Sequence, residues 1–343
     1  MRALVYNGPS QLALEERPKP QIEHTSDAII KLDYTTICGT DLHILKGDVP
    51  EVTKGRILGH EGVGTIVEVG SGVTSHAVGD QVLISCISAC GACTYCRRNM
   101  YSHCTTGGWV LGHTIDGTQA EYVRIPHVAT STYKVPRGVD PQALVMLSDI
   151  FPTAYEMGVL SSKVLPGSTV VIVGAGPVGL AALVTAKLYS PSWVLVVDPD
   201  ENRLEVAREW GAVDACTPAE AVGKVRELTE GVGADCVIEC VGIPETFEQC
   251  QELVAPGGVV ANVGVHGTKA DLQLQKLWAS NISITMGLVD TVSTPTLLRL
   301  LGSGKLAADK MITHRFKFAD MEKAYGTFGA AAKEKALKVL VEM

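Results

Sequence analysis

The chain has 343 residues, of which 46% are hydrophobic and 19% are charged, so it can fill two cores of roughly 150 residues each and is not a largely disordered protein. Its formal net charge is −8, and no run of Lys and Arg marks a basic surface. We therefore expect neither a nucleic acid nor a membrane as a partner.

The N-terminal part of the sequence predicts a β-rich unit. The first twenty residues lack the apolar core and the small-residue cleavage site of a signal peptide, so we expect a cytoplasmic protein. Residues 1–150 are rich in Gly, Val, Ile and Thr, and short apolar runs such as GTIVEVG and DQVLISC are broken by glycines. This pattern is typical of short strands with many turns.

Two short motifs in this part carry candidate metal ligands. Cys38 lies at the end of an apolar run in TTICGTDLH, and GHEGVG follows 22 residues later with His60 and Glu61 between glycines. A thiolate, an imidazole and a carboxylate would form a three-ligand zinc site with an open position. Spacing alone does not identify the carboxylate, and Cys38 and His60 taken singly are also explained as core residues.

A second cysteine cluster follows in CGACTYCRRNMYSHC. Cys90, Cys93, Cys96 and Cys104 have the spacing C-x₂-C-x₂-C-x₇-C, which lets one loop surround a tetrahedral ion with four thiolates. Such a site has no open position, so we expect a structural zinc and chemistry elsewhere. The alternative is a redox pair or a set of small buried residues. The remaining cysteines lie in apolar segments and are expected to be core residues: Cys86, Cys216, Cys236, Cys240 and Cys250.

From about Val164 the sequence alternates between apolar strands and helical stretches, which predicts a parallel, doubly wound sheet. Residues 164–186 are uncharged, but their β-branched run stops at GAGPVG, so a strand, a tight turn and a buried helix explain them better than a membrane span. Gly174, Gly176 and Gly179 then occupy the positions of a dinucleotide-binding turn. The last 50 residues end on ALKVLVEM, a strand expected to rejoin the first unit.

Five motifs, CGTDLH, GHEGVGTIVEVG, the four-cysteine loop, LSDIFPTAYE and VVIVGAGPVG, occur in the order and spacing of the zinc-dependent medium-chain alcohol dehydrogenases. The resemblance covers essentially the whole chain. It implies an α/β protein with a GroES-like β-rich catalytic domain over residues 1–152, completed by 288–343, and a doubly wound Rossmann NAD-binding domain over 153–287.

The resemblance also implies the catalytic metal site. The chain is most similar to the branch whose third ligand is Asp, here Asp149, so Cys38, His60 and Asp149 are expected to bind a catalytic zinc. With two anionic ligands the ion is neutralised, and a permanent third carboxylate would weaken its attraction for an alkoxide. Glu61 is therefore expected to be an occasional ligand, and Asp41 to orient the imidazole of His60.

Further residues are expected to move a proton and to bind the cofactor. Thr40 and His43 resemble the proton relay of the family, which passes from a hydroxyl through the cofactor ribose to an imidazole. Asp198, at the end of the second strand, is expected to bind the adenosine ribose and to favour NAD over NADP, with Arg203 nearby. The remaining residues expected at the nucleotide are Pro177, Val178 and Thr153.

The sequence says less about substrates and partners. Trp109, Leu288, Ile87 and Phe151 fall where family members line an apolar cleft, so we expect an alcohol, aldehyde or ketone of apolar character. We also expect a homo-oligomer, a tetramer or a dimer. A polyol, formaldehyde or amino-alcohol dehydrogenase of the same fold is the alternative enzyme, and a non-catalytic nucleotide-binding scaffold is the alternative class.

Overall fold

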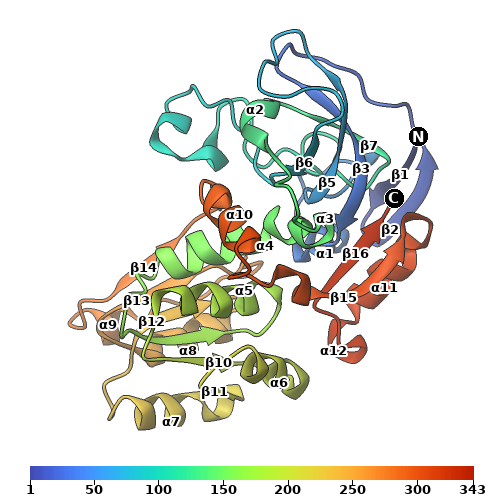
Figure 1. Ribbon diagram of the computed structural model, residues 1–343. Helices are drawn as coiled ribbons and strands as arrows, with labels where there is room; N and C mark the ends of the chain where they lie inside the picture. Colours follow the sequence, from blue (N-terminus) through green and yellow to red (C-terminus); the bar gives the residue numbers. More distant parts are fainter. The chain divides into compact units, whose positions relative to one another are not determined.

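The computed structural model describes residues 1–343 and separates into two compact units. Unit 1 comprises Met1–Asp149 and Asp290–Met343, and unit 2 comprises Ile150–Val289. Both chain termini therefore belong to unit 1 (Figure 1).

Unit 1 is built mainly from β-strands, as its sequence predicts. A seven-stranded sheet has the order β15-β16-β3-β5-β6-β8, with β7 also paired to β3, and a three-stranded sheet has the order β2-β1-β4. Their bounds are β1 (Arg2–Gly8), β2 (Gln11–Glu16), β3 (Ala28–Thr36), β4 (Arg56–Ile57), β5 (Gly62–Val69), β6 (Gln81–Ile84), β7 (Tyr122–Ile125), β8 (Thr132–Lys134), β15 (Ile312–Lys317) and β16 (Lys338–Glu342).

The helices of unit 1 are short and connect these strands. They are α1 (Gly39–Lys46), α2 (Val128–Ser131), α3 (Pro141–Leu144), α10 (Thr294–Gly302), α11 (Met321–Gly329) and α12 (Ala331–Glu334). Single 3₁₀ turns cover Cys96–Arg98, Tyr101–His103, Val145–Leu147, Ala308–Met311 and Phe318–Asp320.

The C-terminal segment completes the core of unit 1. β16 pairs with β3 in antiparallel register, with Leu340 opposite Thr36, which confirms that ALKVLVEM rejoins the first unit. Apolar side chains of α11, including Phe328, pack with Val339 and Val341 of β16. Because these contacts join the last residues to the first strands, the C-terminus is part of the scaffold that carries the candidate site.

Unit 2 has a six-stranded sheet in the order β11-β10-β9-β12-β13-β14, and every pair in it is parallel. This is the doubly wound order in which the first strand lies at the centre. The strands are β9 (Thr169–Val173), β10 (Trp193–Val197), β11 (Asp214–Cys216), β12 (Ala234–Glu239), β13 (Val254–Asn262) and β14 (Ser283–Met286). The helices are α4 (Ile150–Thr153), the π-helix Ala154–Leu160, α5 (Pro177–Ala186), the 3₁₀ turn Lys187–Tyr189, α6 (Glu201–Glu209), α7 (Pro218–Leu228), α8 (Pro244–Leu253) and α9 (Leu274–Leu277).

Helices cover both faces of this sheet. Val171 and Val237 belong to one buried cluster with side chains of α7 and α8. The next residues along the same strands, Ile172 and Ile238, point to the opposite face, because side chains alternate along a strand. There they lie beside Gly179 of α5 and Gly158 of the π-helix, where an added Cβ atom would be 3.4 Å from Ile172 and 3.1 Å from Ile238. The continuous apolar strands of the sequence follow from this burial on both sides.

The uncharged segment 164–186 forms β9 and α5, which confirms the strand, turn and helix interpretation. No single helix is long and apolar enough to cross a membrane, and one bent pair, Pro141–Leu147 with Ile150–Leu160, meets that test by length and composition alone.

The third glycine of the turn provides a test of this packing. A Cβ atom on Gly179 would lie 1.8 Å from the carbonyl oxygen of Gly174, whereas one on Gly176 would have no neighbour within 4 Å. We expect Gly179→Ala to lower the unfolding free energy by about 3 kcal/mol or more, and the control Gly176→Ala to lower it by less than about 1 kcal/mol. Denaturant unfolding measures both, and equal losses in the two variants would contradict the packing described.

Candidate active site and metal centres

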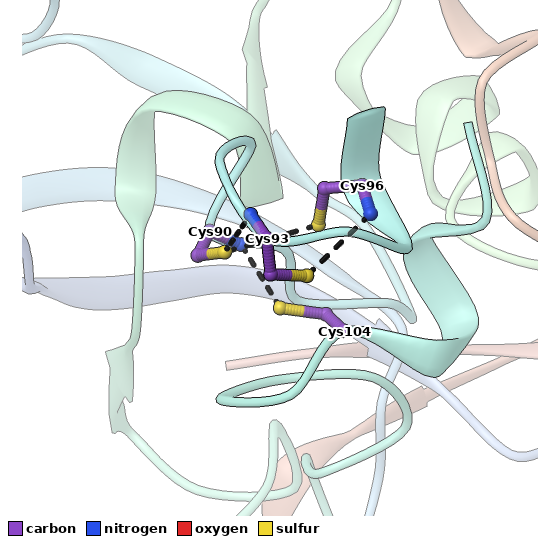
Figure 2. Close-up of side chains that lie close together, drawn as sticks. All are labelled: Cys90, Cys93, Cys96 and Cys104. Atoms are coloured by element: carbon purple, nitrogen blue, oxygen red, sulfur yellow. Dashed lines mark hydrogen bonds between the residues drawn. The ribbon is translucent and has the colours of Figure 1, made fainter. Parts of the chain in front are cut away.

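The four-cysteine loop gathers its sulfur atoms into one cluster (Figure 2). The sulfurs of Cys90, Cys93, Cys96 and Cys104 all lie within 4.8 Å of one another, and none of them is in a disulfide. The Sγ atoms of Cys90 and Cys96 are 3.9 Å apart. A zinc tetrahedron with Zn–S bonds of about 2.3 Å has edges of roughly 3.8 Å. The loop therefore fits a four-thiolate metal site.

Backbone amides stabilise thiolates in this loop. The amide of Cys93 donates to Cys90 Sγ at 3.3 Å, and the amide of Cys96 donates to Cys93 Sγ at 3.5 Å. The hydrogen bond from the Cys96 amide is the main reason why the pKa of the Cys93 thiol falls to about 5. Metal ions bind thiolates rather than thiols, so this backbone arrangement favours metal binding at neutral pH.

A second cluster brings together Cys38, His60, Glu61 and Asp149, with one ligand atom of each within 4.8 Å of the others. Asp149 Oδ2 lies 3.6 Å from Cys38 Sγ and 3.3 Å from His60 Nε2. Cys38 directly precedes α1, and His60 and Glu61 directly precede β5. Asp149 follows the turn Val145–Leu147. Three segments distant in the sequence thus present a thiol, an imidazole and two carboxyl groups to one point.

Two glycines let the His60–Glu61 segment lie close to its neighbours. Gly59 has a φ of +91°, and a Cβ atom there would lie 2.7 Å from Thr118 Oγ1; a Cβ atom on Gly62 would lie 2.8 Å from Leu32 Cδ1. The amide of Gly62 donates to Ser148 Oγ at 3.1 Å. That bond joins the segment of His60 to the turn that carries Asp149.

The electrostatics of this cluster favour a bound cation. Burial raises the pKa of the Cys38 thiol. Burial alone lowers the pKa of His60, but hydrogen bonds with Asp149 and Cys38 outweigh it and hold that pKa well above its usual range. The buried acidic groups lack the solvation that their charged forms need. A divalent ion would supply the missing positive charge, and nitrogen, oxygen and sulfur ligands are the set that zinc prefers.

Glu61 is also paired with a lysine that the sequence analysis did not identify. Lys338 Nζ of β16 lies 2.7 Å from Glu61 Oε1, and both side chains are only 1% exposed. The same ammonium group donates to the carbonyl oxygen of Ile37 at 2.9 Å. Burial raises the pKa of Glu61 to about 7, although Lys338 acts in the opposite direction.

Asp41 is buried beside the cluster and contacts the backbone of Cys38. Its Oδ2 accepts hydrogen bonds from the Cys38 amide at 2.9 Å and from Gln119 Nε2 at 3.1 Å, and Tyr325 donates to the other end of Gln119 at 2.8 Å. Oδ1 has no hydrogen-bond partner, so the structure shows no bond from Asp41 to the imidazole of His60. In this structure Asp41 positions the start of α1.

Thr40 and His43 lie in the same helix, α1. Thr40 Oγ1 is 3.6 Å from Cys38 Sγ, which places this hydroxyl beside the candidate metal site. His43 Nδ1 lies 2.9 Å from Asp48 Oδ2, and the His43 side chain is 34% exposed. Asp48 was not among the expected residues, because nothing in the local sequence marks it as the partner of an imidazole.

Some of the expected cleft residues lie near the cluster. The ring of Trp109 meets His60 edge-on with centroids 6.4 Å apart, and it stacks on His113 at 4.3 Å. Ile87 is buried in unit 1, whereas Phe151 is fully buried in unit 2 and Leu288 of unit 2 is 45% exposed. Cys86 was expected only as a core residue; it is buried, and its thiol also lies 3.7 Å from Asp149 Oδ1.

In unit 2, the expected cofactor-binding residues other than Thr153 lie at or just after the carboxyl ends of β9 and β10. Asp198 Oδ2 accepts a hydrogen bond from the amide of Ala175 at 2.7 Å, and Oδ1 accepts one from Asp200 at 2.9 Å. Arg203 Nη1 lies 3.8 Å from Asp198 Oδ2. Gly174 and Gly176 precede α5, Gly179 lies in its first turn with Pro177 and Val178, and Thr153 ends α4.

Sequence reasoning missed a buried carboxylate at the same edge of this sheet. Glu239, the last residue of β12, is fully buried, and its Oε1 accepts hydrogen bonds from the amides of Val241 and Gly242 at 2.9 Å. Its other oxygen lies 3.8 Å from His266 Nε2. Glu239 thus holds the turn after β12 in place. The sequence alone shows only one polar residue at the end of an apolar strand.

Two family models match this chain. Residues 24–137 match the "Alcohol dehydrogenase GroES-like domain" and residues 177–302 match the "Zinc-binding dehydrogenase" domain. A "Zinc-type alcohol dehydrogenase B" from Aspergillus flavus is 37% identical over 98% of this chain and 81% of its own length. The chain belongs to the zinc-dependent medium-chain alcohol dehydrogenase family. This confirms the resemblance and the fold class predicted from the sequence.

Solved structures of this alcohol dehydrogenase family agree. The apo form of "Zinc dependent alcohol dehydrogenase 2" from Streptococcus pneumonia has 48% identity and a TM-score of 0.96, over 100% of this chain and 98% of that one. A short chain alcohol dehydrogenase from E. coli CFT073, complexed with NADH, has 28% identity and a TM-score of 0.91, over 100% of this chain and 99% of that one. The chain is thus an alcohol oxidoreductase by family.

Removal of one loop thiol tests the first metal centre. We expect Cys93→Ala to lose one metal ion per chain and to lower Tm by about 5 °C or more, because binding at such a loop contributes directly to folding. Cys250→Ala is the control, since Cys250 is fully buried outside both clusters. Elemental analysis and thermal unfolding measure both effects. A full metal complement in Cys93→Ala would exclude this assignment.

Proposed function

We propose that this alcohol dehydrogenase transfers hydride between an apolar primary or secondary alcohol and NAD, giving an aldehyde or a ketone. The observation that carries the proposal is the convergence of Cys38, His60 and Asp149, whose thiol, imidazole and carboxylate lie within 4.8 Å of one another, with His60 buried and the other two half-buried. A non-catalytic scaffold has no need of that set. Residues 1–152 with 288–343 would form the catalytic domain, and 153–287 the nucleotide-binding domain.

The residues of this chain would share the chemistry as follows. Cys38, His60 and Asp149 would hold a catalytic zinc, which supplies a Lewis acid that lowers the pKa of the alcohol hydroxyl. The Thr40 hydroxyl, which lies beside Cys38, would accept the substrate proton. His43 would pass that proton to solvent, and Asp48, 2.9 Å from its Nδ1, would fix the orientation of the ring.

The preference for NAD depends on Asp198. Both of its oxygens already accept backbone hydrogen bonds, and each keeps a lone pair for a ribose hydroxyl. A 2′-phosphate would meet the carboxylate instead, although Arg203 offsets part of its charge. The fold does not choose the cofactor, since a solved structure from Sinorhizobium meliloti with 26% identity and a TM-score of 0.86 is bound to NADP.

The proposal also includes an apolar substrate and a homo-oligomeric assembly. The Trp109 ring lies beside His60, with centroids 6.4 Å apart, and such an apolar surface next to the cluster favours apolar alcohols over sugars. A homo-oligomer, tetramer or dimer, is supported by β14, an edge strand of the sheet: its last residue, Met286, is 73% exposed, and Trp278, five residues before the strand, is 81% exposed. None of the ten cysteines forms a disulfide, as is usual for a cytoplasmic protein.

The experiment that tests the proposal combines metal analysis with a substrate panel. We expect two zinc ions per chain and alcohol-dependent reduction of NAD, faster with unbranched or aromatic alcohols than with sorbitol. Loss of activity and of one zinc in Asp149→Asn would support the catalytic site. Activity on sorbitol above that on apolar alcohols would exclude the substrate class, and an inactive protein with a single zinc would favour the scaffold.

The role of Asp198 predicts a change in cofactor preference. We expect Asp198→Gly to lower the ratio of kcat/KM for NAD to kcat/KM for NADP by about tenfold or more, because the ribose hydroxyls lose their acceptor. Asp200→Asn is the control, since its carboxylate caps α6 by accepting from the amide of Asn202. The zinc content of both variants should stay unchanged. Wild-type enzyme that prefers NADP would refute this assignment.

The proposed relay predicts a change in the pH profile. We expect His43→Gln to slow alcohol oxidation by about tenfold or more, and most below neutral pH, where hydroxide cannot replace the imidazole as proton acceptor. His24→Gln, at an exposed histidine, serves as the control. Initial rates between pH 5 and 9 with zinc content measured in parallel give the result. A profile parallel to that of the wild type would remove His43 from the relay.

A further inference from the structure

We propose that Lys338, a residue of the C-terminal strand, positions Glu61 and decides whether its carboxylate binds the metal at the Cys38 site. This inference rests on the proposed function, because it concerns the same metal site. It assigns Lys338 a positioning role: the side chain acts on the site only through Glu61.

The first observation is that the ion pair between Lys338 and Glu61 is shielded from solvent. Lys338 Nζ and Glu61 Oε1 are 2.7 Å apart, and each side chain is 1% exposed, so water does not compete for the contact. The ammonium group is held from a second direction by the carbonyl oxygen of Ile37 at 2.9 Å. Lys338 itself begins β16, where its carbonyl oxygen accepts a hydrogen bond from Thr313. The cation is therefore fixed in place.

The second observation is that the backbone of Glu61 is held independently of its side chain. The hydroxyl groups of Thr35 and Thr118 both donate to the Glu61 carbonyl oxygen at 2.8 Å. Glu61 Oε2 is buried and has no hydrogen-bond partner, and a carboxylate oxygen of Glu61 lies within 4.8 Å of the other three ligand atoms. With the backbone held and a carboxylate oxygen already near the other ligand atoms, we infer that a change of side-chain rotamer would let Glu61 bind a metal ion.

Charge explains why the lysine decides between the two positions. The thiolate of Cys38 and the carboxylate of Asp149 together neutralise a divalent ion, and Lys338 neutralises Glu61. With the lysine removed, Glu61 would be a buried carboxylate without a counter-ion, which is strongly unfavourable. The metal is then the nearest cation available to it, so Glu61 would become a permanent additional ligand.

Cobalt substitution tests the inference without reliance on activity. The holoenzyme is prepared with Co²⁺ at the Cys38 site and zinc in the four-cysteine loop, and Lys338→Met is compared with the wild type and with Lys338→Arg. We expect the visible absorption of Lys338→Met to show a rise from four to five ligands. We also expect a chelator to remove its metal about tenfold more slowly, since partners of metal ligands typically change metal affinity by 10- to 100-fold.

The double variant Glu61→Gln/Lys338→Met separates coordination from general damage. It removes the carboxylate as well as the cation, so its spectrum and metal release should return to those of the wild type, and Lys338→Arg should stay close to the wild type. If Lys338→Met does not fold, Lys338→Gln takes its place. An unchanged cobalt spectrum in the folded variant would overturn the role of Lys338. Failure of the wild type to bind cobalt at the Cys38 site would instead refute the proposed function.

Discussion

The arrangement of unit 1 depends on compensating the negative charge that is buried at the Cys38 site. Cys38, Glu61 and Asp149 are acidic groups that lie together with little access to water, and Asp41 is buried behind them. Burial of such groups is unfavourable unless cations or hydrogen bonds accompany them. Lys338 supplies one charge and a metal ion would supply the rest. This requirement links the ligand segments to distant parts of the chain.

The C-terminal segment, Asp290–Met343, supplies much of the compensation for this buried charge. Lys338 contacts Glu61 and the carbonyl group beside Cys38, and Tyr325 of α11 reaches Asp41 through Gln119. Both side chains belong to the segment Asp290–Met343, which follows the whole of unit 2 in the sequence. The site therefore cannot be complete until this segment has paired β16 with β3. Metal binding and folding of the C-terminal strand should be coupled for this reason.

Parts of the fold and site that are marked by a motif of neighbouring residues could be predicted from the sequence, whereas residues that no motif marks could not. GAGPVG predicted its turn because position 179 requires glycine, since a Cβ atom there would lie 1.8 Å from the carbonyl oxygen of Gly174. The cysteine spacing predicted a metal loop. Asp149 followed only from the family resemblance, since its segment alone is consistent with an ordinary helix start. Lys338 gave no signal, because its partner lies 277 residues away and a lysine in a C-terminal strand looks like a surface residue. Asp48 and Glu239 have partners close by in the sequence, at His43 and at Val241 and Gly242, but no motif marks either carboxylate as a partner.

The two candidate metal centres differ in what surrounds them. The four-cysteine loop is tied to the point where the chain returns to unit 1: Asp290 Oδ1 accepts hydrogen bonds from the amide of Ser102 at 2.8 Å and from its hydroxyl at 2.6 Å. Thr291, the next residue, has a φ of +59° and shares a 2.9 Å hydrogen bond with Ser85, one residue before Cys86. Positive φ is unfavourable for a β-branched residue and persists only when its surroundings enforce it. An ion held by four thiolates would thus contribute rigidity at this junction, whereas a site with three ligands and a movable carboxylate keeps the open position that a reaction requires.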